Sequence, residues 1–210
     1  VKDYTEMKKA AITFFEKNVI TAASVLTQMI RLHQIICGHI KTDDGEIKSI
    51  KSNRIKELLE VLEETNGKVI IWAVYRYDIQ QIEKTLGEKY GKESVATYYG
   101  DTKDNIRQSI VDRFMDPNSD LRFFVGNPKT GGYGLTLTSS HTVVYYSNDY
   151  SLEVRLQSED RAHRIGQTSK VTYVDLITDH TIDEKIVKAL NAKIDLASQV
   201  MGEDPKKILF

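Results

Sequence analysis

The chain has 210 residues, which is enough for one α/β domain with additional helices and a sizeable core. Its formal net charge of -1 argues against a broadly basic nucleic-acid surface, so any such contact must be a local patch. The single cysteine, Cys37, excludes an internal disulfide, and no apolar run approaches the ~20 residues of a membrane span.

The predicted elements begin with helices and continue as a regular alternation of strands and helices. Apolar residues at helical spacing predict helices over 2–17 and 20–37, and the polar segment 38–52 is predicted to be a mobile loop. From residue 53 onward the alternation indicates βαβ units, and therefore an α/β fold with a doubly wound parallel sheet and helices on both faces. The expected strands cover 68–74, 94–99, 121–126, 142–147 and 171–177, and the expected helices cover 53–65, 77–89, 103–115, 151–164 and 181–198.

These elements divide the chain into three parts. Residues 1–52 are expected to form a helical hairpin and a loop that pack on the following domain. Residues 53–200 are expected to form that domain, and 201–210 a C-terminal tail. Because the chain starts at Val1 inside a polar, helix-like run, we expect it to be a piece of a longer protein.

Two arginines stand close together in the stretch QSEDRAHRIGQ, residues 157–167. On a helix, Gln157, Arg161 and Arg164 share one face. Two neighbouring guanidinium groups repel each other, so this arrangement is most sensible if an anion or carboxylates lie opposite them. The alternative is a solvated basic face with local salt bridges, for which Glu153 and Asp160 are the available partners.

A second face of the same predicted helix carries Val154, Ala162 and Ile165, and it could dock on the sheet. The arginine face would then point into a cleft.

The stretch NPKTGGYGLTL, residues 127–137, joins a predicted strand to the next segment. Its glycines, Gly131, Gly132 and Gly134, allow a close approach of the backbone to a ligand, although a flexible turn is the simpler interpretation. The phosphate-loop pattern is absent, since the nearest segment, GEKYGKE at 87–93, has the wrong spacing and lacks the hydroxyl that Mg²⁺ needs. The chain also lacks an Asp-Glu-x-His box. Arginines can bind phosphate, but this chain has no phosphate-binding loop of its own. That combination is typical of an arginine finger, which reaches into a nucleotide site formed by another domain or protein.

Cys37 lies near His33 and His39, a set that could suggest a metal site. Two imidazoles and one thiol at a probable helix end are more often a structural accident, so no metal site is predicted. The lone cysteine and the absence of a signal-peptide pattern favour a reducing compartment, the cytoplasm or, in a eukaryote, the nucleus.

The stretch QSEDRAHRIGQ closely resembles motif six of the Swi/Snf-family ATPases of helicase superfamily two. Other segments resemble the same family in the same order, so that the resemblance covers about residues 2–198. They are RLHQIICGH before the lobe, KVIIWAVYRYDI at motif four, YYGDTKDNIRQSIVDRF with its Gly-x-Thr and Arg, KTGGYGLTLTSSHTVVYYS at motif five, and VTYVDLITDHTIDEKI after motif six.

The chain departs from the family pattern at several positions. Ser147 replaces the aspartate after the strand of motif five, and YSL at 150–152 replaces Trp-Asn-Pro. Thr136 replaces the asparagine of Gly-Leu-Asn-Leu, and Ala73 and Val74 replace the serine and glutamine common in motif four. These departures indicate a divergent branch, for which a phage or bacterial source is one hypothesis.

The resemblance implies that the chain is the second RecA-like lobe, the helicase C-terminal lobe, of a two-lobed motor with an N-terminal helical extension. It implies an ATP-dependent translocase that moves along double-stranded DNA without separating the strands. The first lobe of the same polypeptide would carry the phosphate loop, and ATP and Mg²⁺ would lie between the lobes, bound mainly by the first. This chain alone is expected to be inactive and monomeric, with no membrane partner and no tightly bound cofactor.

The resemblance also implies roles for individual residues around the nucleotide. Arg161 and Arg164 would reach across to the β- and γ-phosphates as the catalytic pair. Gln157 would help to sense the nucleotide, and Asp160 would orient the arginines.

The glycine turn and the block after the second strand would couple this cleft to DNA. Gly132 and Gly134 would belong to the nucleotide-coupling turn. The residues expected to touch phosphates of one strand without reading sequence are Gly100, Thr102, Arg107, Thr130 and Gly131.

Two other functions stay open. A strand-separating DNA or RNA helicase of the same superfamily would use the same arginines, although the His-Arg-Ile-Gly-Gln ending argues against it. A non-catalytic nucleic-acid-binding or regulatory module would follow if the partner lobe were inactive.

Overall fold

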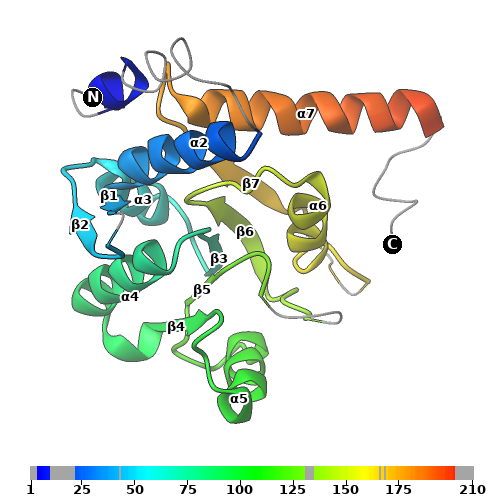
Figure 1. Ribbon diagram of the computed structural model, residues 1–210. Helices are drawn as coiled ribbons and strands as arrows, with labels where there is room; N and C mark the ends of the chain where they lie inside the picture. The colour runs from blue at the N-terminus through cyan, green and yellow to red at the C-terminus, as the bar shows by residue number, and fades with distance from the viewer. Residues whose placement is uncertain are drawn as a thin grey trace.

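The computed structural model describes residues 4–9, 22–42, 44–130, 135–165, 167 and 169–201. In this part of the chain, a five-stranded parallel sheet has the strand order β4-β5-β3-β6-β7 (Figure 1). This order and the helices on both faces confirm the predicted doubly wound α/β fold. The strands are β3 (Lys68–Trp72), β4 (Val95–Tyr98), β5 (Phe123–Gly126), β6 (Ser140–Tyr145) and β7 (Thr172–Asp175).

Alternate residues of the central strand β3 face the two sides of the sheet. Val69 and Ile71 point to one side, and Ile70 and Trp72 to the other, and all four are fully buried. A strand with apolar residues on both sides is stable only between two helical layers, which explains the continuous run KVIIW. Since all four strand pairs are parallel, the carboxyl ends of the strands lie along one edge of the sheet.

Helices cover each face of the sheet. On one face pack α3 (Arg54–Glu63) and α4 (Arg76–Tyr90), through Leu58, Leu62, Ile79 and other apolar residues. On the other face pack α5 (Asp104–Met115) and the turn that follows α6 (Leu152–Asp160), through Phe114 and Ala162. A short 3-10 helix, η1 (Lys92–Ser94), precedes β4.

A third cluster lies where α2 (Ala22–Cys37) packs against α7 (Ile182–Met201). Figure 1 shows these two helices side by side above the sheet, with α7 extending away from it. Residues 4–9 are helical and Tyr4 joins this cluster, whereas the rest of the predicted helix 2–17 lies outside the described residues. Within the described part of the chain, no helix is long and apolar enough to cross a membrane.

The prediction of a loop over residues 38–52 is wrong, because β1 (His39–Lys41) and β2 (Ile47–Ser49) form an antiparallel hairpin there. One tertiary contact and one main-chain hydrogen bond across the hairpin fix it. The buried His39 places Nδ1 3.0 Å from Oδ1 of Asp78 in α4. The amide of Ile50 donates to the carbonyl of Gly38 at 2.8 Å. Neither contact has a signature in the local sequence, which is polar.

A buried ionic cluster ties the helical layer to the sheet. Arg54 at the start of α3 pairs with Asp183 in α7 and also donates to the carbonyl of Tyr146 after β6. His33 of α2 lies on the other side of Asp183, with Nε2 3.4 Å from Oδ1. Burial alone would raise the pKa of Asp183, but the hydrogen bond from His33 and the charge of Arg54 outweigh burial and hold that pKa below its usual value.

Candidate nucleotide and nucleic-acid interface

The candidate interface lies at the carboxyl edge of the sheet, where ligands bind in open α/β folds. Three segments that leave the central strands are tied together there. Asn127 after β5 donates from Nδ2 to the carbonyl of Val74 after β3, at 2.8 Å. The hydroxyl of Ser147 after β6 accepts from the amide of Val74 at 2.9 Å. Ser147 stands where the Swi/Snf pattern has aspartate, and here its hydroxyl holds the loop that follows β3.

Helix α6 ends at Asp160, so the prediction of a helix over 151–164 is wrong at its carboxyl end. The amides of Ala162 and His163 both donate to the carbonyl of Glu159, at 3.1 and 3.0 Å, and the chain turns. The turn allows Ala162 to be buried on the sheet while the carbonyl of Arg161 accepts from Leu137 at 2.8 Å. Gln157, Arg161 and Arg164 therefore do not share one helical face.

The second predicted face is confirmed only at Ala162. Val154 is half-buried, and Ile165 is fully exposed because the turn carries it away from the sheet. The buried residues of α6 itself are Leu156, Ser158 and Glu159.

Arg161 is largely buried, with 7% of its surface exposed. Its Cζ lies 5.1 Å from the ring centroid of Trp72, and its Nη1 donates to the carbonyl of Thr130 at 3.0 Å. Burial lowers its pKa, an effect that the nearby tyrosines partly offset. Thr130 is the last described residue before the glycine turn. Gly131, Gly132 and Gly134 lie outside the described residues.

Arg164 is exposed, and within the described ranges its guanidinium has two partners. Its Nη1 donates to Oγ1 of Thr136 at 3.0 Å, and its Nε lies 3.9 Å from Oδ2 of Asp160. This is the Asp160 salt bridge expected of a solvated face, whereas Glu153 is bonded instead by Gln157, at 3.0 Å. Exposed pairs of this kind contribute about 0–1 kcal/mol, so the guanidinium of Arg164 is readily released to an anion.

The predicted DNA-facing block after β4 is partly turned inward. Thr102 is buried, and its hydroxyl donates to the carbonyl of Thr97 at 3.1 Å and accepts from the amide of Tyr99 at 3.0 Å. Arg107 donates from Nε to the carbonyl of Thr102 at 3.0 Å. These two residues shape the loop that contains the exposed Gly100, so its backbone is better placed for a phosphate than the Thr102 side chain.

Sequence reasoning missed two exposed cations at the same edge. Arg76 pairs with Asp101 at 3.0 Å, next to Gly100, and Lys129 pairs with Asp149 at 2.7 Å. Both cations follow a buried strand within a few residues, which is the signal that could have identified them.

The three residues that could have suggested a metal site, His33, Cys37 and His39, lie in different surroundings. His39 pairs with Asp78, whereas His33 pairs with Asp183 and hydrogen-bonds the hydroxyl of Tyr75 at 3.0 Å. Cys37 is buried, and burial raises the pKa of its thiol well above the usual value. In the described ranges, no three or more His, Cys, Asp or Glu residues come together in a way that could hold a metal ion.

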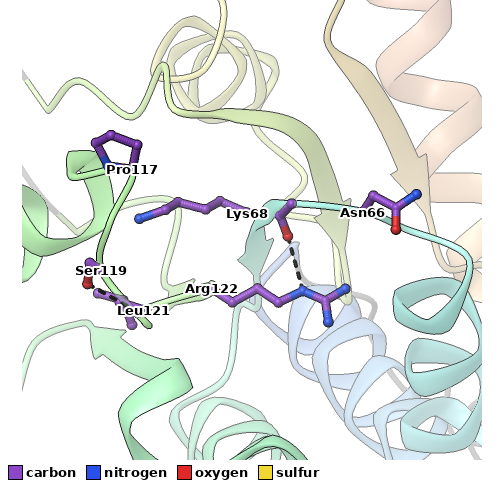
Figure 2. Close-up of a pocket in the computed structure, with 7 residues that line it drawn as sticks. Asn66, Lys68, Pro117, Ser119, Leu121 and Arg122 are labelled. Atoms are coloured by element: carbon purple, nitrogen blue, oxygen red, sulfur yellow. Dashed lines mark hydrogen bonds between the residues drawn. The ribbon is translucent and has the colours of Figure 1, made fainter.

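A pocket of about 390 Å³ lies near the amino ends of β3 and β5, where Lys68 begins β3 and Arg122 precedes β5 (Figure 2). Its two cations already have main-chain partners. Arg122 donates from Nε to the carbonyl of Gly67 at 3.0 Å, and Lys68 donates from Nζ to the carbonyl of Asp116 at 2.7 Å. These contacts hold loops together, so we assign no ligand to this pocket.

The fold and the arginine turn define a RecA-like α/β lobe. The chain belongs to the helicase conserved C-terminal domain family, whose model matches residues 50–166. It is 32% identical over 185 residues to the ATP-dependent helicase fft2 of Schizosaccharomyces pombe, covering 87% of this chain and 14% of that protein. It is 39% identical over 168 residues to the human SWI/SNF-related matrix-associated actin-dependent regulator of chromatin subfamily A member 1, covering 79% of this chain and 15% of that protein.

Solved structures agree. The C-terminal part of the Fun30 ATPase domain matches with 28% identity and a TM-score of 0.60, covering 67% of this chain and 46% of that one. The Sulfolobus solfataricus SWI2/SNF2 ATPase core in complex with double-stranded DNA has the same fold, with 23% identity and a TM-score of 0.72, covering 93% and 42%. These comparisons confirm the predicted Swi/Snf resemblance and the RecA-like C-terminal lobe.

Proposed function

We propose that this chain is the second motor lobe of an ATP-dependent double-stranded DNA translocase, and that Arg164 is its arginine finger. The observation that carries the proposal is the exposure of Arg164 on the turn that begins at Arg161, beside the carboxyl end of β3, with surface contacts to Thr136 and Asp160 among the described residues. A planar guanidinium donates two parallel hydrogen bonds to phosphate oxygens, which a solvated side chain can do without losing a strong contact.

The nucleotide would be held mainly by a first lobe, because this chain has no phosphate-loop pattern. Bound ATP and Mg²⁺ supply the phosphoryl group and the metal that neutralises its charge. Arg164 would add positive charge where negative charge develops, and Asp160 would hold its guanidinium in place beforehand. Gln157 stays a candidate nucleotide sensor, with Gly132 and Gly134 in the coupling turn. The lobe alone is expected to be inactive.

The buried Arg161 suits a coupling role better than a second finger. Its guanidinium binds the carbonyl of Thr130 and stacks on Trp72, so a displacement of this arginine would be transmitted to the glycine turn. Gly100, Thr102, Arg107, Thr130 and Gly131 remain the proposed DNA-facing set, and Arg76 and Lys129 supply the exposed charge next to them. The acidic partners Asp101 and Asp149 would be exchanged for DNA phosphates, which makes binding dependent on salt.

The test compares DNA-stimulated ATP hydrolysis by the full-length protein and its Arg164→Ala variant. A guanidinium that acts mainly in the transition state should cost about 10³–10⁵ in rate when it is removed, with ATP and DNA affinity largely retained. The matched control is Arg113→Ala, which removes an exposed arginine of α5 that pairs with Glu93 at 3.1 Å. The control should leave the rate unchanged. A loss of less than about tenfold for Arg164→Ala would reject the finger.

A further inference from the structure

Gln167 makes an unusual set of contacts beside the arginine turn. Its Nε2 lies 3.1 Å from each of three main-chain carbonyl oxygens, those of Thr138, Ser140 and Ala162. A side-chain amide carries only two N–H donors, so the three carbonyls share them. The Oε1 of the same side chain accepts from the amide of Ser169 at 3.2 Å, and both ends of the amide are therefore engaged.

These contacts fasten the turn to the first residue of β6 and to the segment that precedes it. Thr138 belongs to that segment, Ser140 is the first residue of β6, and Ala162 belongs to the turn. The amide of Gln167 also donates to the carbonyl of Arg164 at 2.9 Å, which closes the turn around Arg164. The same segment carries Thr136, whose hydroxyl accepts from the guanidinium of Arg164 at 3.0 Å. Residues 136–140 thus hold both parts of Arg164. They hold its guanidinium directly through Thr136, and its backbone indirectly through Gln167.

Apolar packing contributes little to this arrangement. Of the described residues from 162 to 167, Ala162 is buried, whereas His163, Arg164 and Ile165 are exposed. A turn with one small apolar anchor has to be fixed by hydrogen bonds, and the side chain of Gln167 supplies one to Thr138 before β6 and one to Ser140 at its start.

We propose that Gln167 is a positioning residue, which fixes the turn so that the guanidinium of Arg164 is presented at the place where phosphate charge develops. Gln167 touches main-chain carbonyls and acts through Arg164, so this inference rests on the proposed finger role of Arg164. The proposed role requires N–H donors that face the three carbonyls. A side chain of the same shape without donors would not fix the turn.

The test uses the full-length protein and two variants that separate donors from shape. Gln167→Met keeps the length of the side chain and removes both donors, and Gln167→Lys supplies three donors to the three carbonyls. A misplacement of a catalytic group by about 1 Å can cost on the order of 10²-fold, so Gln167→Met should lower kcat by about tenfold to 100-fold. Its KM for ATP should stay within about twofold, and Gln167→Lys should restore most of kcat.

Rates are compared at a temperature at which circular dichroism shows each variant folded. If Gln167→Met does not fold, Gln167→Asn takes its place, because it withdraws the amide from the carbonyls by one methylene. A kcat for the donor-free variant close to that of the wild type overturns the proposal. Equal losses in the Met and Lys variants overturn it as well, since donor chemistry would then not be the cause.

A double mutant separates this inference from the proposed function. If Gln167 acts only through Arg164, then Gln167→Met should cause little further loss in an Arg164→Ala background. A full additional loss would mean that Gln167 supports the lobe in another way, and the proposal would be wrong while the finger stands. If Arg164→Ala alone leaves the rate unchanged, the finger itself fails, and the positioning role fails with it.

Discussion

The guanidinium of Arg161 lies over the indole ring of Trp72, with 5.1 Å between Cζ and the ring centroid. Trp72 ends the central strand β3, and Arg161 follows α6, so this contact joins the middle of the sheet to the arginine turn. Arg164, three residues later, is exposed and contacts Thr136 and Asp160. Two arginines that look equivalent in the sequence therefore occupy different environments.

Arg161→Ala should lower the free energy of unfolding by about 2 kcal/mol, because it removes a desolvated cation–π contact and the donor to Thr130. Arg164→Ala should change that free energy by no more than about 0.5 kcal/mol, since Arg164 is itself exposed. Urea unfolding of the purified chain, followed by circular dichroism, measures both. Equal destabilisation by the two substitutions would contradict the difference in their surroundings.

Asp183→Asn should lower the free energy of unfolding by about 3 kcal/mol at neutral pH, because it leaves the buried charge of Arg54 without its carboxylate. The matched control is Glu184→Gln in the same helix, whose exposed partner Lys188 lies 3.9 Å away. The control should cost less than about 0.5 kcal/mol.

The Asp183 contribution should also depend on pH. The pKa of this carboxyl is lower in the folded chain than its usual value, so the folded state favours the ionised form. The stabilisation is therefore fully present above about pH 5 and is lost as the pH falls through the folded pKa. Urea titrations of wild type and Asp183→Asn should show a constant difference between about pH 5 and 7 that narrows below pH 3.8. A difference that widens on acidification would refute the sign.

Gly126→Ala should destabilise the chain by about 1–3 kcal/mol through overpacking. Gly126 ends β5, and an added Cβ would lie 2.8 Å from Cζ3 of Trp72 and 2.9 Å from the carbonyl of Tyr98. Gly87→Ala in α4 is the control, because its nearest neighbour would be 3.8 Å away. There the substitution should stabilise the helix by about 0.5–1 kcal/mol, so the two melting temperatures should shift in opposite directions.

The strands of this lobe were predictable because the residues of each strand indicate by themselves that the strand is buried. A run such as KVIIW has apolar residues on both sides of the strand, and only a sheet covered by helices on both faces can bury it. The hairpin between His39 and Ser49 was missed because its stability depends on Asp78, which is distant in the sequence.

The arginine motif was identified correctly as a candidate site, but its geometry could not be read from spacing. Arg and Ala favour helices, so local propensity extends α6 past Asp160. The chain turns there because Ala162 packs on the sheet and Arg161 stacks on Trp72, and both are tertiary contacts. The same contacts decide which arginine is buried, and no periodicity in the sequence encodes that choice.

The anchoring of α7 at one end has a mechanical consequence. Its first part is fixed through Asp183, Ile186 and Leu190, while the whole helix of 20 residues extends about 30 Å at 1.5 Å per residue (Figure 1). A helix that is fixed along its first part moves with the lobe as a rigid body. The helix reaches about 16 Å beyond Leu190, so when the lobe rotates by about 20° about that residue, the far end of the helix travels about 6 Å. A small rotation of the lobe is in this way enlarged at the carboxyl end of α7.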